Sequence, residues 1–332
     1  MKHSELYLKF LIISICMASV ALCSCGIVPH GTTGTNGGTY TEFILDTFCS
    51  VTVNSSDENS GEIAEYAFSA AREIQKSTDF YDPDSNVSNF NSAAAGEAVS
   101  LDDYTFDIVR LALEVSEKSG GAFDITIAPV SELWDFKSDN PKPPDDKLIK
   151  EALSLVNCKN LVLDENARTL TKLKSGVKID LGSCAKGYAC EKIQQLIADK
   201  YPNAYVLIDF GGNIGVCGNN PKHKDGHTTI GIQEPFKDTG VYNRTADIYS
   251  GQSAVTSGTY QRHFYFGGKN YHHLLDPKTG YPAEPGIDSV TIISNSSCLS
   301  DCLSTACFIL GEENGAALAE AYGAKAIWIK GE

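Results

Sequence analysis

Apolar positions along this 332-residue chain follow in some stretches the two-residue period of strands and in others the spacing typical of helices. Helical spacing predicts helices at residues 62–80, 103–119, 146–156, 179–200, 298–310 and 313–322. Alternating or short apolar runs rich in β-formers predict strands at residues 42–53, 161–163, 169–173, 176–179, 205–209, 228–233, 242–249, 287–294 and 324–330. Because strands and helices follow no regular β-α-β order, the pattern predicts an α+β fold.

The stretch 257–282 concentrates residues that carry chemistry. It contains three of the seven histidines, His263, His272 and His273. Two apolar-rich runs flank the Gly/Asn sequence 267–270, which predicts a β-hairpin that ends at a turn over 276–280. Since successive strand residues face opposite sides, we expect one of His272 and His273 to face a pocket and the other to face away. Taken alone, the pair is equally compatible with ordinary half-buried strand residues.

Polar and aromatic residues alternate with turn signals at 80–91, which predicts a surface loop whose aromatics contact a ligand. Glycine and serine begin the predicted helix near 182, with Lys186 in its first turn, a plausible start for binding phosphate. Tyr188 stands where a Walker loop requires lysine, so that motif is excluded.

Asp301 and Thr305 lie four residues apart, hence on one face of a predicted helix. With a backbone carbonyl, their oxygens would suit Mg²⁺. The simpler interpretation of Asp301 is an acidic residue in the first turn that interacts with the helix dipole.

The formal net charge of −15 argues against nucleic acid as a partner, because such binding needs clustered Lys and Arg. A polyanionic ligand would therefore need a local positive element, such as a metal ion or one placed lysine.

The first residues predict export. Lys2 and Lys9 precede an uncharged apolar run that is too short for a comfortable membrane span. The run ends in a sequence that resembles a bacterial lipoprotein cleavage box, with Cys25 as the lipidated residue; a plain signal peptide or an uncleaved anchor is the alternative. We therefore expect a signal peptide at 1–24, a flexible tether at 25–40 and one domain at 41–332, anchored by lipid to the extracytoplasmic face of the cell membrane. The eight cysteines that follow the leader sit mostly in apolar periodic segments, which predicts free buried thiols.

Taken together, these stretches resemble the ApbE family, the FAD:protein FMN transferases. The motifs that carry the resemblance, in chain order, are Leu45-Asp46-Thr47, the loop 80–91, G-A-F-D-I-T-I-A-P at 121–129, I-D-L-G-S-C-A-K-G-Y-A at 179–189, F-G-G-N at 210–213, T-S-G at 256–258, Y-H-H-L-L-D-P-K-T-G-Y-P at 271–282 and D-C-L-S-T-A at 301–306. The resemblance implies one two-lobed domain, with mixed or antiparallel sheets flanked by helices and FAD in a central cleft. It also implies Mg²⁺-dependent transfer of the FMN moiety of FAD to a threonine hydroxyl of an exported protein through a phosphoester bond, with release of AMP.

The resemblance assigns roles residue by residue. Residues implied in FAD binding are Leu45, Tyr81, Ala122, Phe123, Asp124, Lys186 and His273. Residues implied as Mg²⁺ ligands or their near neighbour are Ala185 through its carbonyl, Asp301, Ser304 and Thr305. Catalysis is expected from Lys186, His273 and Asp301: lysine and metal take up charge on the leaving phosphate, Asp301 or a metal-linked group is the base, and His273 positions or donates.

The chain departs from the family's usual pattern at Asp46, Cys184, Asp209-Phe210 and Gln261, and none of these positions is an implied metal ligand. Two other functions stay open on the sequence: a pyrophosphatase that converts FAD to FMN and AMP, and a lipoprotein that only carries flavin. The implied partner is an exported flavin-acceptor protein, for example a redox-pump or electron-transfer subunit.

Overall fold

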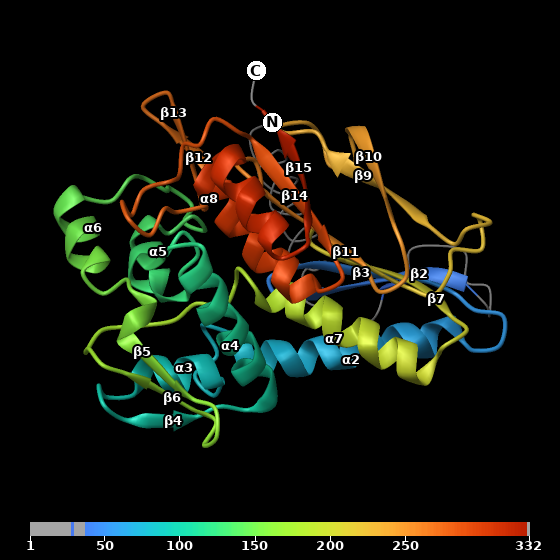
Figure 1. Ribbon diagram of the computed structural model, residues 1–332, viewed down its shortest axis with the longest axis horizontal. Coiled ribbons are helices and arrows are strands. Elements are labelled where there is room, and N and C mark those ends of the chain that lie inside the picture. Colours follow the sequence, from blue (N-terminus) through green and yellow to red (C-terminus); the bar gives the residue numbers. More distant parts are fainter. Residues whose placement is uncertain (1–27, 30–36, 331–332) are drawn as a thin grey trace, which may run out of the picture.

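A single antiparallel sheet of eight strands forms the centre of the protein, in the order β1-β2-β3-β7-β8-β11-β14-β15 (Figure 1). The structure, a computed structural model, describes residues 28–29 and 37–330. The strands are β1 (Val28–Pro29), β2 (Gly37–Ile44), β3 (Thr47–Asn54), β7 (Tyr205–Phe210), β8 (Asn213–Cys217), β11 (Ser253–Gly258), β14 (Ser289–Ser294) and β15 (Lys325–Ile329).

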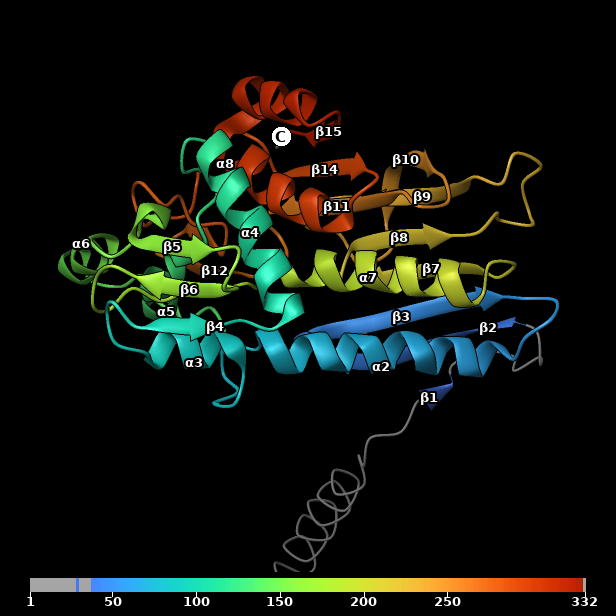
Figure 2. The same cartoon turned by 60° about the horizontal axis from the view of Figure 1, so that its bottom comes forward.

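The two faces of this sheet are covered differently, as strand alternation requires. Val206 and Ile208 belong to the core shared with helices α2 (Ser60–Thr78), α7 (Ala185–Lys200) and α8 (Ser297–Ala321). Tyr205 and Leu207 point the other way and pack against the hairpin of β9 (Thr228–Gln233) and β10 (Tyr242–Ile248). Figure 2 shows α2 and α7 running side by side along the sheet.

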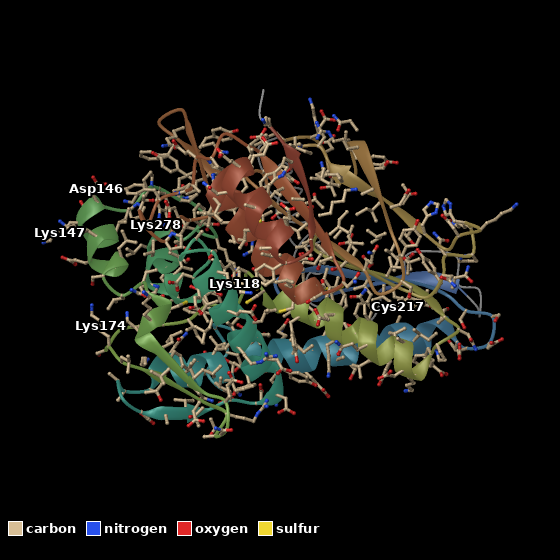
Figure 3. The ribbon with its side chains drawn as sticks, viewed as in Figure 1. Lys118, Asp146, Lys147, Lys174, Cys217 and Lys278 are labelled. Carbon is tan, nitrogen blue, oxygen red and sulfur yellow. The ribbon has the colours of Figure 1, made fainter. Side chains whose placement is uncertain are left out.

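A smaller lobe lies at the other end of the molecule (Figure 1, left). Its elements are α3 (Asn86–Ser92), α4 (Asp103–Lys118), α5 (Ala128–Trp134), α6 (Asp146–Leu153), two 3-10 turns (Ile125–Ile127 and Cys158–Asn160), the three-stranded sheet β4 (Ala98–Ser100), β6 (Thr169–Lys172) and β5 (Leu161–Asp164), and the hairpin β12 (His263–Phe266) and β13 (Lys269–His272). The buried Trp134 lies within a cluster of aromatic side chains that includes residues of the hairpin. Its indole N–H donates to the Gly280 carbonyl at 2.8 Å. In Figure 3, Asp146 and Lys147 of α6 lie near Lys278, and Asp146 accepts a hydrogen bond from the Tyr281 hydroxyl.

The α+β class and most elements match the sequence predictions, and several segments differ. The strand predicted at 42–53 is two strands, β2 and β3, joined by a two-residue turn whose Leu45 and Asp46 have φ of 54° and 61°. The segment 176–179 is not a strand, and the polar loop 80–91 contains helix α3, because the Ser85 hydroxyl caps it by accepting from the Ser88 N–H. The hairpin loop is Gly267-Gly268 alone, since Phe266 pairs with Lys269.

Strand β2 begins at Gly37, inside the range 25–40 predicted as a tether. The predicted signal peptide 1–24 and Cys25 lie outside the described residues. Within the described part of the chain, no helix has the length and apolar character needed to cross a membrane.

Candidate active site

A cavity of about 1000 Å³ opens between the helix ends, the main sheet and the smaller lobe. Its wall combines the β2–β3 turn, the start of α5, the segment before α7, the β7–β8 turn, the β9–β10 hairpin and one side of α8. A cavity of this size is at the upper end for ligand pockets. Eight of the residues implied by the resemblance lie on its wall: Tyr81, Ala122, Phe123, Asp124, Lys186, His273, Asp301 and Thr305.

The close approach of α7 and α8 places Asp301 in the cavity. The Gly187 N–H, in the first turn of α7, donates to Asp301 Oδ2 at 2.8 Å. A Cβ at position 187 would meet the Ser297 carbonyl oxygen at 2.4 Å and Asp301 Cβ at 2.6 Å, so only glycine allows this spacing. Residues 114 positions apart in sequence are thereby joined.

Asp301 is a buried acid with little local compensation. It lies in the second turn of α8, which begins at Ser297, and is only 5% exposed, so a dipole role in the first turn does not account for it. Desolvation raises the pKa of Asp301, and the Lys186 charge, the Gly187 N–H and the neighbouring Asn213 amide oppose that rise. A carboxylate in this setting is stabilised by a bound cation.

The two adjacent histidines of the hairpin end face opposite sides, as strand alternation predicts. His272 is buried away from the cavity, with Nε2 3.0 Å from the Ala283 carbonyl oxygen and its ring edge-on to Phe308. His273 lies on the cavity wall, and its backbone N–H donates to the Arg262 carbonyl at 3.0 Å. Desolvation, with the Arg262 charge adding to it, lowers the pKa of His273 to about 3, so the imidazole is neutral near pH 7.

The residues implied as metal ligands divide into two groups. Asp301 and Thr305 present their side chains along the cavity wall, one helical turn apart. Ala185 is buried in the core as the first residue of α7, with its N–H bound to the Leu181 carbonyl at 2.8 Å. The Ser304 hydroxyl is buried, donates to the Asp301 carbonyl at 2.9 Å and lies 2.8 Å from the Ser257 hydroxyl. The side chain of Ser304 therefore supports the helix instead of lining the cavity.

The residues implied in FAD binding also differ in what they present. Tyr81 is 74% exposed at the cavity rim. Asp124 lines the wall, but its carboxylate accepts from the Thr126 N–H and from the Cys158 N–H, at 2.8 and 2.9 Å. Leu45 packs against the core, whereas its neighbours Asp46 and Thr47 line the cavity.

Several residues of the wall escaped sequence reasoning. Lys137, at the start of a proline-rich charged segment whose composition is typical of an exposed loop, lines the cavity and pairs with Asp46. Asp180, in the segment before α7, is a second half-buried acid on the wall, and desolvation raises its pKa as well. Arg262 comes from the stretch singled out for its histidines, but its contact with Asp46 joins positions 216 residues apart. No local sequence signal marks such a contact.

Comparison with known proteins gives a consistent result. The ApbE family model matches residues 45–328. A Klebsiella pneumoniae protein named FAD:protein FMN transferase is 35% identical over 234 residues, covering 70% of this chain and 71% of the relative. A Treponema pallidum protein of the same name is 34% identical over 262 residues, covering 74% and 71%.

Solved structures agree with this match. The ApbE protein of Thermotoga maritima superimposes with a TM-score of 0.80 at 32% identity, covering 88% of this chain and 94% of that one. The apo flavinyl transferase ApbE of Pseudomonas stutzeri gives 0.76 at 27% identity, covering 91% and 94%. The sequence match and the architecture lead to one conclusion: this chain belongs to the ApbE family.

Proposed function

We propose that this protein transfers the FMN moiety of FAD to a threonine hydroxyl of an exported acceptor protein, with Mg²⁺, and releases AMP. The observation that carries the proposal is that Lys186, His273, Asp301 and Thr305, from three distant segments, line one large cavity. Relatives at 34–35% identity are named FAD:protein FMN transferase, which gives the proposal its substrate class.

The residues present fit a magnesium ion whose coordination is completed by the substrate. Within residues 28–29 and 37–330, no group of three or more His, Cys, Asp or Glu side chains is placed to hold a metal. Asp301 therefore contributes one carboxylate and Thr305 one hydroxyl, which is too few for a closed protein site. Mg²⁺ commonly uses one or two carboxylates and takes further oxygens from substrate phosphates and water. Bound there, Mg²⁺ would neutralise charge on the diphosphate.

The chain's own groups account for the other requirements of the transfer. The acceptor hydroxyl oxygen forms a bond to the flavin-side phosphorus, while the bond from that phosphorus to the bridging oxygen breaks and AMP departs with the electron pair. Lys186, on the wall beside Asp301, offers a positive charge to the departing phosphate. His273, neutral near pH 7, can hydrogen-bond but brings no charge. The hydroxyl proton passes to a carboxylate of the wall, where desolvation raises the pKa of Asp180, Asp209 and Asp301 and makes them better bases.

The test is an incubation of the purified protein with FAD, Mg²⁺ and a candidate acceptor protein. We expect flavin fluorescence on the acceptor that survives a denaturing gel, together with one AMP per flavin transferred. Free FMN and AMP without labelled acceptor would instead show hydrolysis, and unchanged FAD would show carriage only. Asp301→Asn keeps the side-chain shape and should abolish transfer. Asp103→Asn, which removes an exposed ion pair with Arg168 outside the cavity, should leave it intact.

We also propose that Cys25 carries a lipid that anchors the protein to the extracytoplasmic face of the membrane. Support comes from the sequence around this cysteine alone. In a bacterial host, Cys25→Ser should lose incorporation of labelled fatty acid and move to the fraction without membranes; unchanged labelling would reject Cys25 as the site.

A further inference from the structure

An ion-pair cluster joins three separate segments of the cavity wall. Asp46 Oδ2 lies 2.7 Å from Lys137 Nζ and 2.7 Å from Arg262 Nη2. Asp46 belongs to the β2–β3 turn, Lys137 to the segment after α5, and Arg262 to the segment before β12. All three residues line the cavity and are 46–49% exposed, so the cluster faces the space that a ligand would fill.

The turn that carries Asp46 is held in an unusual conformation. Leu45 and Asp46 both have positive φ, 54° and 61°, a region that L-residues other than Asn and Asp enter at a cost. The Leu45 N–H donates to the Gln75 side chain of α2 at 2.5 Å, which ties the turn to the underlying helix. The Asp46 carboxylate is therefore presented to the cavity from a rigid support, and its two partners are long flexible side chains.

Each partner of Asp46 contacts a residue that the family resemblance implies in FAD binding. Lys137 Nζ lies 5.2 Å from the centre of the Tyr81 ring, within range for a cation–π contact. The Arg262 carbonyl accepts a hydrogen bond from the His273 backbone N–H at 3.0 Å. Hydrogen bonds and charges from Lys137 and Arg262 outweigh desolvation and lower the pKa of Asp46, so the carboxylate is ionised near pH 7.

We propose that Asp46 is a positioning residue for FAD, which orders Lys137 and Arg262 on the cavity wall before the substrate binds; this inference rests on the proposed function. Long cationic side chains that are ordered in advance lose less conformational freedom on binding. In the opposite role, Asp46 only neutralises Lys137 and Arg262. Its charge would then repel the FAD diphosphate, and its removal would strengthen FAD binding. The two roles predict effects of opposite sign.

Asp46→Asn separates them, because asparagine tolerates positive φ and keeps the turn while it removes the charge. We expect the KM for FAD, and the Kd for FAD measured by calorimetry without Mg²⁺, to rise about tenfold, or about 1.4 kcal/mol. The kcat should stay within about threefold, since a positioning role acts on binding. Asp103→Asn is the matched control ion pair and should bind FAD as the wild type does. Asp46→Gly also keeps the backbone conformation and serves if the asparagine variant folds poorly.

A double-mutant cycle tests whether Asp46 acts through its partners. In a Lys137→Met, Arg262→Gln background, Asp46→Asn should weaken FAD binding by less than twofold. FAD binding that stays unchanged or becomes tighter in the single variant overturns the inference, and so does an equal loss in both backgrounds. If the wild-type protein does not bind FAD, both the proposed function and this inference are rejected. If the wild type binds FAD and the Asp46 variant binds it equally well, this inference alone is rejected.

Discussion

At the residue scale, His272 and His273 show how adjacent positions acquire different tasks. Strand alternation directs His272 into the core against Phe308 and His273 toward the cavity. Desolvation keeps both imidazoles neutral, with the pKa lowered to about 4 for His272 and about 3 for His273. His273 thus contributes hydrogen bonding at physiological pH, and the lowered pKa of both histidines makes the fold sensitive to acid.

That sensitivity has a definite sign. The histidine pKa in the unfolded chain is about 6.5, so between about pH 6.5 and pH 4 the unfolded state binds a proton at position 272 that the folded state does not. The free energy of unfolding should therefore fall by about 2 kcal/mol between pH 7 and pH 5 on account of His272. We expect urea denaturation of His272→Gln to lack this loss.

The comparison of the two proteins isolates the histidine. The raised pKa values of Asp180, Asp209 and Asp301 oppose the trend, because folding favours their protonated forms, but they act equally in both proteins. The same change in stability with pH in both proteins would show that the folded protein takes up a proton at His272 as readily as the unfolded chain does.

At this scale, the sequence predicted those candidate site residues whose position follows from the helix or strand pattern around them. Asp301 and Thr305 share a helix face and Lys186 lies in the first turn of a helix, which local geometry predicts, whereas strand alternation left open which of His272 and His273 faces the cavity. Asp46, Lys137 and Arg262 meet only after three distant segments fold together, and Lys137 follows the local signals of an exposed loop.

At the element scale, the contact between α7 and α8 determines whether a site exists. A helix was predicted at 179–200, and α7 begins later, at Ala185. Its distance from α8 was not predicted, because that distance depends on the absence of a side chain at Gly187. Similarly, the break between β2 and β3 was missed because Leu45-Asp46 lacks the glycine or asparagine that usually marks a two-residue hairpin turn. Element types follow from periodicity, whereas these junctions follow from tertiary contacts.

Gly187→Ala tests this contact directly. The new methyl would overlap a backbone oxygen at 2.4 Å, so α7 and α8 must separate. We expect a loss of about 3 kcal/mol in the free energy of unfolding, at the upper end for overpacking, and a loss of flavin transfer because Asp301 moves away from the Gly187 N–H. Denaturant titration and the gel assay measure the two effects.

Gly61→Ala is the matched control in another helix. Its Cβ would meet the Asn59 side-chain oxygen at 3.2 Å, so this side chain, which caps α2 by accepting from the Gly61 N–H, must shift by a few tenths of an ångström. Alanine is a better helix former than glycine, which offsets this shift, so the stability of this variant should stay close to that of the wild type. Wild-type stability and activity in Gly187→Ala would contradict this prediction, because the two helices would then keep a functional spacing without the glycine.

At the scale of the whole molecule, the cavity wall carries charges of both signs. A protein of net charge −15 brings Lys137, Lys186 and Arg262 to one wall, where they face Asp46, Asp180 and Asp301. A mixed wall of this kind suits a ligand that arrives with its own anionic groups and a divalent cation, because each neutralises part of the wall that the other cannot.

This arrangement predicts that FAD and Mg²⁺ stabilise the protein together more than the sum of their separate effects. Mg²⁺ alone would find one carboxylate and one hydroxyl, so a millimolar concentration should shift the melting temperature by less than about 1 °C. FAD at about 100 times its Kd should stabilise the protein by about 2.7 kcal/mol, or roughly 5 °C for a domain of this size, and Mg²⁺ at about 100 times its Kd for the FAD complex should add about the same again. Thermal denaturation followed by circular dichroism, with EDTA as the metal-free control, measures this. In Asp301→Asn the extra shift should vanish while that of FAD alone remains. A full shift with Mg²⁺ alone would mean that the metal site is complete without the diphosphate, and that the ion does not link substrate to protein.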